Sequence, residues 1–178
     1  FRFPFPEAHN LSNALCAIAI GVALGLSPAE MAERAPGIEL SRLRGERVRL
    51  RGGILLLNDC YNANPISMRA ALEALCAREA AGRRIAVLGG MAELGPDAPG
   101  FHAEVGALAR GSGIDPVIGV GELARDYSPD EWAPDPDAAA ELVGGRLREG
   151  DVVLVKGSRS VGLERFTDAL RARLGEES

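Results

Sequence analysis

The segment Gly53-Ile54-Leu55-Leu56-Leu57-Asn58-Asp59-Cys60-Tyr61-Asn62-Ala63-Asn64-Pro65 decides the fold. A run that is apolar at every position, as at residues 54–57, is typical of a strand buried on both faces of a parallel sheet. Asn64 is a favourable N-cap and Pro65 suits the first helical position, so a helix should begin there. The polar residues between them therefore form a loop from the carboxyl end of a strand to a helix. In open α/β sheets, ligands bind at such loops.

Three further apolar runs, at residues 85–88, 117–120 and 152–155, predict buried strands, and residues 46–51 alternate as in a half-exposed strand that turns at Gly52-Gly53. Amphipathic helices are expected in between, with inward-facing sets Met68/Leu72/Leu75, Phe101/Val105/Leu108 and Leu163/Phe166/Leu170/Leu174. Asp137 is expected to cap one more helix, and residues 126–137 to form a surface loop. Strands that alternate with helices indicate a Rossmann-like, doubly wound, mostly parallel α/β sheet.

The first 38 residues follow a different pattern. They predict two helices, the second opened by a capping box at Ser27-Pro28-Ala29-Glu30, and Ala35-Pro36-Gly37 then breaks the pattern. Two helices without a strand beside them cannot bury their apolar faces alone. We therefore expect residues 1–38 to be the tail of a neighbouring domain, and residues 39–178 to form the Rossmann-like domain.

Composition excludes several classes of protein. The net charge is −5 and the arginines form no basic stripe, which argues against a nucleic-acid-binding module. The longest apolar stretch, residues 14–26, is interrupted by glycines and is too short to span a bilayer, and no secretory signal is visible. The three cysteines lack metal-ligand spacing, so we predict no metal site and a reduced, cytoplasmic protein that does not bind a membrane.

Three predicted strand ends carry unusual loops, at residues 58–64, 89–95 and 156–160. Because the carboxyl ends of parallel strands open at the same edge of a sheet, these loops should converge on one ligand. The Gly-rich loop at residues 89–95 fits no phosphate fingerprint, and the sequence holds no G-x-x-x-x-G-K-[ST] motif. By spacing alone this loop reads as a tight turn, and His102 reads as a packing or surface residue.

The loop at residues 58–64 leaves two interpretations open for its acid. Asp59 either accepts hydrogen bonds from a ribose, as acids do in nucleotide sites, or closes an Asx-turn. The helix cap alone explains Asn64, whereas nothing local explains Asn62. Tyr61 is equally suited to packing.

Lys156 is the only lysine among the 20 Lys and Arg residues of the chain. It follows a buried strand and precedes a helix start, where a cation can face an anionic group. A surface lysine is the ordinary alternative. The preference for arginine elsewhere in the chain weakens that alternative, because the compact ammonium and the planar guanidinium are not interchangeable at a tight site.

Four stretches together resemble the Mur ligases of bacterial cell-wall synthesis over nearly the whole chain. They are Ala8-His9-Asn10-Leu11-Ser12-Asn13-Ala14-Leu15, the segment Asn58 to Pro65 quoted above, Val87-Leu88-Gly89-Gly90-Met91-Ala92-Glu93-Leu94-Gly95, and Leu154-Val155-Lys156-Gly157-Ser158-Arg159-Ser160. The second is most similar to the family member that joins D-Ala-D-Ala to UDP-N-acetylmuramoyl-tripeptide. Such ligases use ATP and Mg²⁺, pass through an acyl phosphate and have three domains. The resemblance implies that this chain is the tail of the central domain plus the whole third domain of a monomeric enzyme.

The resemblance also implies roles on the ATP side. By position, Asn10 and Asn13 would lie near the adenine, Arg44 would reach the ATP phosphates, and Asp59 would hold the ribose. Two residues depart from the family pattern: Leu43 stands where a glycine usually precedes the arginine, and Gly90 replaces a usual aspartate. The P-loop, the Mg²⁺ ligands and a modified lysine of the central domain are not in this sequence, so we expect the chain alone to be inactive.

On the other side, Asn62, Asn64, Lys156, Ser158 and Arg159 would line the entrance for the dipeptide, with Lys156 beside the reacting carboxylate or phosphate. Two alternatives remain. One is another Mur-type amino-acid ligase or a folylpolyglutamate synthase, and the other is a non-catalytic Rossmann-like binding module.

Overall fold

The computed structural model describes residues 1–4, 8–38 and 43–177, and the chain divides into two compact units, Phe1–Ser41 and Arg42–Ser178. The predicted boundary between residues 38 and 39 adjoins residues 39–42, which lie outside the described ranges, so it stays a prediction.

The first unit holds helices α1 (Ala8–Ala23) and α2 (Pro28–Arg34) and a short 3-10 turn, η1 (Ala35–Gly37). On α1, Leu15 is 65% exposed and Val22 is 51% exposed, in line with the expectation that these helices cannot bury their apolar faces alone. The predicted capping box is wrong. Ser27 is the N-cap residue and its carbonyl accepts the first bond of the helix, from the Met31 N–H, but its side chain makes no capping hydrogen bond.

In the second unit, six strands form one sheet within the described residues, in the order β1-β2-β6-β3-β4-β5. Only β1 runs antiparallel to its neighbour, and the other pairs are parallel. The predicted Rossmann-like, mostly parallel sheet is therefore confirmed. The strands are β1 (Glu46–Leu50), β2 (Ile54–Asp59), β3 (Arg84–Gly89), β4 (Val117–Val120), β5 (Glu131–Ala133) and β6 (Val152–Lys156).

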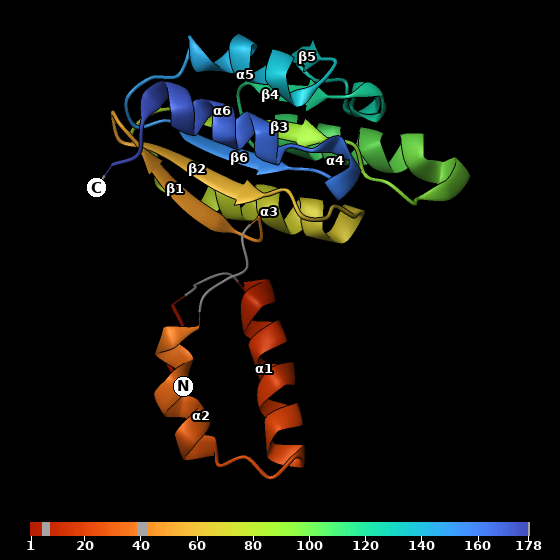
Figure 1. Ribbon diagram of the computed structural model, residues 1–178. Helices are drawn as coiled ribbons and strands as arrows, with labels where there is room; N and C mark the ends of the chain where they lie inside the picture. Colours follow the sequence, from red (N-terminus) through yellow and green to blue (C-terminus); the bar gives the residue numbers. More distant parts are fainter. Residues whose placement is uncertain (5–7, 39–42, 178) are drawn as a thin grey trace. The chain divides into compact units, whose positions relative to one another are not determined.

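Helices cover both faces of this sheet (Figure 1). Helices α3 (Pro65–Ala77) and α4 (Ala98–Gly111) pack on one face, with Met68, Leu72 and Leu75 buried as predicted. Helices α5 (Pro136–Gly144) and α6 (Glu164–Leu174) pack on the other. Short 3-10 turns follow three strands: η2 (Gly95–Asp97), η3 (Glu122–Tyr127) and η4 (Arg159–Val161).

The elements differ from the sequence predictions in four places. Strand β2 continues through Asn58 and Asp59, and its second face is only partly buried. Residues 126–137 are not one surface loop, because they contain the edge strand β5. The carboxylate of Asp135, not of Asp137, caps α5. Helix α4 buries His102 and Val105 and leaves Phe101 exposed, so its inner face is turned by one residue from the predicted one.

The topology singles out the end of β6. After β2 the chain enters α3 on one face of the sheet, and after β6 it enters α6 on the opposite face. The two loops therefore diverge between neighbouring strands, which is the topological switch point where open α/β sheets bind ligands. Lys156 is the last residue of β6 and stands at this point.

Candidate functional site

The three loops predicted to converge do so around β6. Lys156 is the register partner of Asp59 on β2 and of Leu88 on β3, so the ends of these three strands are aligned. The side chain of Lys156 is only 3% exposed, and that of Asp59 is 23% exposed. This arrangement forms the candidate site at the carboxyl edge of the sheet.

An ion pair lies at its centre. The Lys156 ammonium donates to Asp59 Oδ2 at 2.5 Å and to the backbone carbonyl of Asn62 at 3.1 Å. Because an ammonium carries three donors, one N–H has no partner among the described residues and can face a ligand. Asp59 thus has a role that neither interpretation foresaw, because its carboxylate pairs with a buried cation on the neighbouring strand.

The two asparagines of the loop differ in what holds them. The Asn64 side chain accepts from the Ser67 N–H at 2.8 Å, and the Ser67 hydroxyl accepts from the Asn64 N–H at 3.1 Å, so Asn64 is a helix cap as predicted. Asn62 Oδ1 accepts from the Ala63 N–H at 2.9 Å, and its amide nitrogen points to no described partner. The fold explains Asn64 fully and Asn62 only in part.

Ser158 joins the loop after β6 to the loop after β3. Its N–H donates to the Gly90 carbonyl at 3.0 Å, and its hydroxyl accepts from the Ala92 N–H at 2.8 Å. Between them the strand ends approach closely, because a Cβ built on Gly157 would lie 2.8 Å from the Cα of Gly89. A glycine is therefore required at residue 157 for the two loops to meet.

Arg44 lies beside the same loop. Its guanidinium carbon is 3.8 Å from the centre of the Tyr61 ring, and the Tyr61 N–H donates to the Leu43 carbonyl at 3.0 Å. Leu43 has φ +68°, a left-handed conformation that favours glycine. Leu43, which stands where the family usually has glycine, therefore keeps the backbone conformation that favours glycine.

The remaining predicted residues are less closely tied to the centre. Arg159 is exposed and pairs with Glu164 at 3.1 Å. Asn10 and Asn13 lie on α1 in the first unit, which is described by itself, so their distance from Lys156 is not defined. In the described part of the chain, no three His, Cys, Asp or Glu side chains are grouped as metal ligands.

Sequence reasoning missed two polar residues that fix the loop at residues 89–95. His102 Nε2 accepts from the Met91 N–H at 2.8 Å, and the Tyr127 hydroxyl donates to the Gly89 carbonyl at 2.9 Å. Both side chains are fully buried. The sequence shows only that a histidine follows the Gly-rich loop, which does not reveal that its partner is the backbone of Met91.

Cys60 is excluded as a nucleophile. It is fully buried, and its thiol donates to Asn58 Oδ1 at 3.0 Å. Burial, followed by the negative charge of Glu164, raises the pKa of the Cys60 thiol to about 12, so the thiolate is not formed near neutral pH.

Two of the hollows lined by described residues bear on the site. One of about 340 Å³ borders the candidate site and is lined by Gly90, Ala92, Gly121, Glu122, Ser160 and Arg165, among others. At Gly90, a Cβ would lie 2.6 Å from the Leu123 Cβ, so the Leu123 side chain occupies the space of an aspartate there. The other, of about 370 Å³, runs along the edge strand β1.

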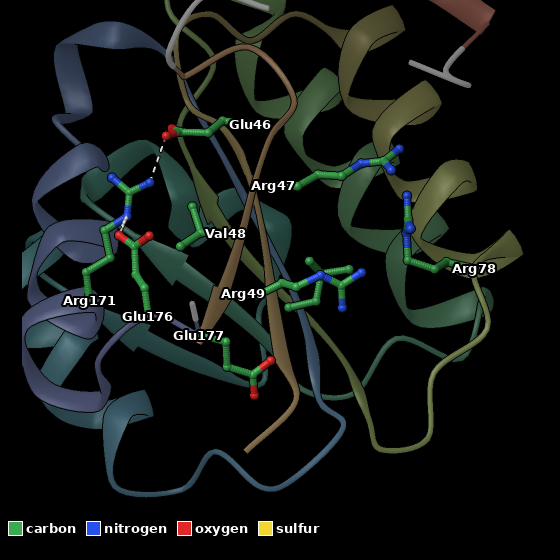
Figure 2. Close-up of a pocket in the computed structure, with 9 residues that line it drawn as sticks. Glu46, Arg47, Val48, Arg49, Arg78, Arg171, Glu176 and Glu177 are labelled. Atoms are coloured by element: carbon green, nitrogen blue, oxygen red, sulfur yellow. Dashed lines mark hydrogen bonds and ion pairs between the residues drawn. The ribbon is translucent and has the colours of Figure 1, made fainter. Parts of the chain in front are cut away.

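Figure 2 shows that edge hollow, with Arg47 and Arg49 on one side of β1 and the Glu46–Arg171 pair on the other. Glu46 and Arg171 are 2.7 Å apart, and Glu176 and Glu177 also line the hollow. Its charges are mixed and it lies away from Lys156, so it is not part of the candidate site. Among the helices of the described ranges, none has both the length and the apolar character needed to cross a membrane.

Known proteins match this chain over the residues of the candidate site. The profile of the family "Mur ligase, glutamate ligase domain" matches residues 43–159. A UDP-N-acetylmuramoyl-tripeptide–D-alanyl-D-alanine ligase from Mycobacterium tuberculosis (strain CDC 1551 / Oshkosh) is 39% identical over 92% of the chain and 38% of its own length. The ligase of the same name from Treponema pallidum (strain Nichols) is 40% identical over 96% of the chain and 39% of its own length. The chain thus spans less than half of these relatives.

A solved structure agrees with the sequence comparison. The MurF ligase from Thermotoga maritima, in complex with ADP, superposes with a TM-score of 0.80 at 27% identity. The match covers 95% of this chain and 40% of that one.

Proposed function

Because the chain belongs to the Mur ligase family, we propose that it is the carboxyl-terminal part of an ATP-dependent ligase that adds D-Ala-D-Ala to UDP-N-acetylmuramoyl-tripeptide. The observation that carries the proposal is the buried Lys156 at the topological switch point, held by Asp59 and Asn62. In the same proposal, residues 1–38 belong to the central domain of the enzyme and residues 39–178 to its third domain. We take the enzyme to be cytoplasmic, where its nucleotide substrates are found, and monomeric, as the family resemblance implies.

ATP fits the side of the site formed by Asp59 and Arg44. Asp59 Oδ2 is taken by Lys156, while Oδ1 has no hydrogen bond among the described residues and can accept from a ribose hydroxyl. The Arg44 guanidinium is exposed above Tyr61 and can reach a phosphate. When bound, ATP supplies the phosphoryl group that activates the substrate carboxylate. We place Asn10 and Asn13 near the adenine, and the Mg²⁺ ligands in the rest of the enzyme.

The acceptor dipeptide fits the opposite side. The free N–H of Lys156 faces the developing negative charge when the dipeptide amine attacks, and a buried cation is most effective where water is excluded. Ser158 and Arg159 follow Lys156 in the loop after β6, and Asn62 and Asn64 lie in the loop after β2, where the Asn62 carbonyl accepts from Lys156. The hollow of about 340 Å³ beside them has room for a dipeptide.

Two alternative functions predict different acceptors. A different Mur-type ligase or a folylpolyglutamate synthase would add a single amino acid, and a binding module would add nothing. The match of the segment Asn58 to Pro65, together with the names of the relatives, favours the dipeptide. Because the 178 residues contain no P-loop motif, we expect the chain alone neither to hydrolyse ATP nor to form the amide.

A fusion enzyme tests the proposal. The amino-terminal part of the M. tuberculosis relative, up to its aligned region, is joined to this chain and assayed for ADP release and for the ligated product. The acceptors are D-Ala-D-Ala, L-alanine, D-glutamate and diaminopimelate, each with its own UDP-muramoyl substrate. We expect product with D-Ala-D-Ala alone.

Two outcomes would contradict it. Product with a single amino acid, or with glutamate in a parallel assay that offers a folate as the substrate, would assign the chain to another ligase. A folded fusion that is inactive with every acceptor, beside an active intact relative, would leave only a binding module. Circular dichroism and thermal unfolding of the fusion establish that it is folded.

A further inference from the structure

The imidazole of His102 is fully buried and uses both ring nitrogens. Nε2 lies 2.8 Å from the Met91 backbone nitrogen, and Nδ1 lies 2.7 Å from the Ala98 carbonyl oxygen. A backbone N–H can only donate and a carbonyl can only accept, so Nε2 must be unprotonated and Nδ1 must carry the proton. The surroundings therefore select one neutral tautomer of His102.

This hydrogen bond links helix α4 to the loop after β3. The same loop is held at Gly89 by the Tyr127 hydroxyl at 2.9 Å, and at Gly90 and Ala92 by the backbone and hydroxyl of Ser158 at 3.0 and 2.8 Å. Four consecutive residues are thus fixed from three different elements. Ser158 stands two residues after Lys156, so these bonds connect the loop at residues 89–92 to the candidate site.

Strain follows immediately after these contacts. Glu93 has φ +63°, which is uncommon for a residue other than glycine, asparagine or aspartate. Such a conformation persists only where the surrounding structure imposes it, and it is frequent at ligand-binding loops. The bonds to Met91 and Ala92 lie directly before Glu93 and can impose it.

We propose that His102 is a positioning residue of the ligase, whose Nε2 holds the loop at residues 89–92 so that Ser158 and Lys156 are set for the acceptor dipeptide. The inference rests on the function proposed above for the site. A histidine that only fills the core would require its volume and its ring contact with Tyr127, whose centre is 4.8 Å away. A positioning histidine requires an acceptor atom at Nε2. Substitutions can therefore distinguish the core-filling role from the positioning role.

The tautomer is tested on the 178-residue chain without any substitution. Long-range ¹H–¹⁵N correlation spectra of the imidazole report which nitrogen is protonated. We expect the Nδ1–H form with an unprotonated Nε2. A ring protonated at Nε2 at neutral pH would overturn the inference, because it could not accept from Met91.

Two variants then separate the acceptor from the volume. In His102→Gln, the amide oxygen can replace Nε2, whereas His102→Phe keeps an aromatic ring of similar size and has no acceptor. Amide exchange at Met91 should be about tenfold faster or more in His102→Phe, which loses one buried hydrogen bond, and near the wild-type rate in His102→Gln. Equal exchange in both variants would contradict the inference.

The functional readout uses the fusion enzyme. We expect His102→Phe to raise the KM for D-Ala-D-Ala about tenfold, His102→Gln to stay within about threefold of wild type, and the KM for ATP to change little in both. Asp151→Asn is the matched control, because the Asp151 carboxylate pairs with Arg83 just before the amino end of β6, at the end of the strand opposite Lys156. The substitution should weaken the fold and leave the dipeptide KM unchanged. A wild-type fusion that forms no product with D-Ala-D-Ala would refute the proposed function. An active fusion whose dipeptide KM is the same in both variants would refute only the role of His102.

Discussion

The ammonium of Lys156 lies 2.5 Å from Asp59 Oδ2, and the two residues are direct partners in the parallel register of β6 and β2. Their surroundings differ, since the lysine side chain is 3% exposed and the aspartate 23%. Water can reach the carboxylate but hardly the ammonium. The cation therefore depends on its partner more than the anion does, and this asymmetry has measurable consequences.

Asp59→Asn should destabilise the chain more than Lys156→Met. Asparagine leaves a buried ammonium without its counter-charge, which costs about 3 kcal/mol or more. Methionine of similar length leaves a carboxylate that water still solvates, so a loss of about 1 kcal/mol is expected. Urea denaturation of the 178-residue chain measures both. A larger loss for Lys156→Met would show that the carboxylate is the more dependent partner.

Acid should weaken the fold near the amino end of β6, the end of the strand opposite Lys156. Burial alone would raise the pKa of Asp151, but hydrogen bonds from the Arg83 guanidinium and from the N–H groups of Arg83 and Arg148 outweigh burial and lower it. A carboxyl with a lowered pKa stabilises the fold above its unfolded pKa, about 3.9, and loses this contribution as the pH falls through the folded value.

The free energy of unfolding should therefore fall as the pH drops below about 4, and the fall should be smaller in Asp151→Asn. Urea titrations between pH 2.5 and 7 measure the slope. Glu46, whose pKa is also lowered, contributes in the same direction: burial opposes the shift, and the hydrogen bonds from Arg171 and Asn58 prevail. An unchanged slope in Asp151→Asn would contradict the assignment to Asp151.

Leu43 should tolerate glycine better than alanine. Its φ of +68° is costly for any residue with a Cβ, by about 1–2 kcal/mol, and both substitutions remove the same packing. The greater freedom of glycine in the unfolded chain offsets part of this gain. We expect Leu43→Gly to be more stable than Leu43→Ala by about 1 kcal/mol in thermal unfolding. If alanine is the more stable, residue 43 does not hold the left-handed conformation in solution.

Tyr61 should act through its ring and not through its hydroxyl. The Arg44 guanidinium stacks on this ring at 3.8 Å, an interaction worth about 0.5–1 kcal/mol at an exposed position. In the fusion enzyme, Tyr61→Ala should raise the KM for ATP about two- to fivefold, and Tyr61→Phe should leave it unchanged. Equal effects of the two substitutions on the KM for ATP would show that the stacking on the Tyr61 ring does not contribute to ATP binding.

The sequence predicted the elements that depend on continuous patterns. β2, β3, β4 and β6 each contain a continuous apolar run, and Asn64-Pro65 marks a helix start by local chemistry alone. β5 has three residues between prolines and acids, too few to show a period, and its pairing with β4 fixes it as a strand. Ser27 is the N-cap residue without a side-chain capping bond, and Asp135 caps α5 in place of Asp137, because backbone geometry, which a sequence does not display, decides which oxygen meets the free N–H groups.

The site was predictable as a region but not as a set of contacts. Parallel strands must open at one edge, so convergence of the loops around Asp59 and Lys156 followed from the fold class. Their ion pair did not follow, because β6 comes last in sequence and only the strand order inserts it between β2 and β3. His102 escaped notice for a similar reason, since its partner Met91 is a backbone group and leaves no signature in the sequence.

The most direct test of the account is the rate of amide formation by the fusion enzyme with wild-type Lys156 and with Lys156→Ala, at saturating ATP, UDP-N-acetylmuramoyl-tripeptide and D-Ala-D-Ala. Loss of one buried donor to a developing negative charge typically lowers kcat about 10²- to 10³-fold. The account predicts a fall of that size in a variant whose circular dichroism shows an intact fold. An unchanged kcat in the folded variant would contradict the central role of Lys156.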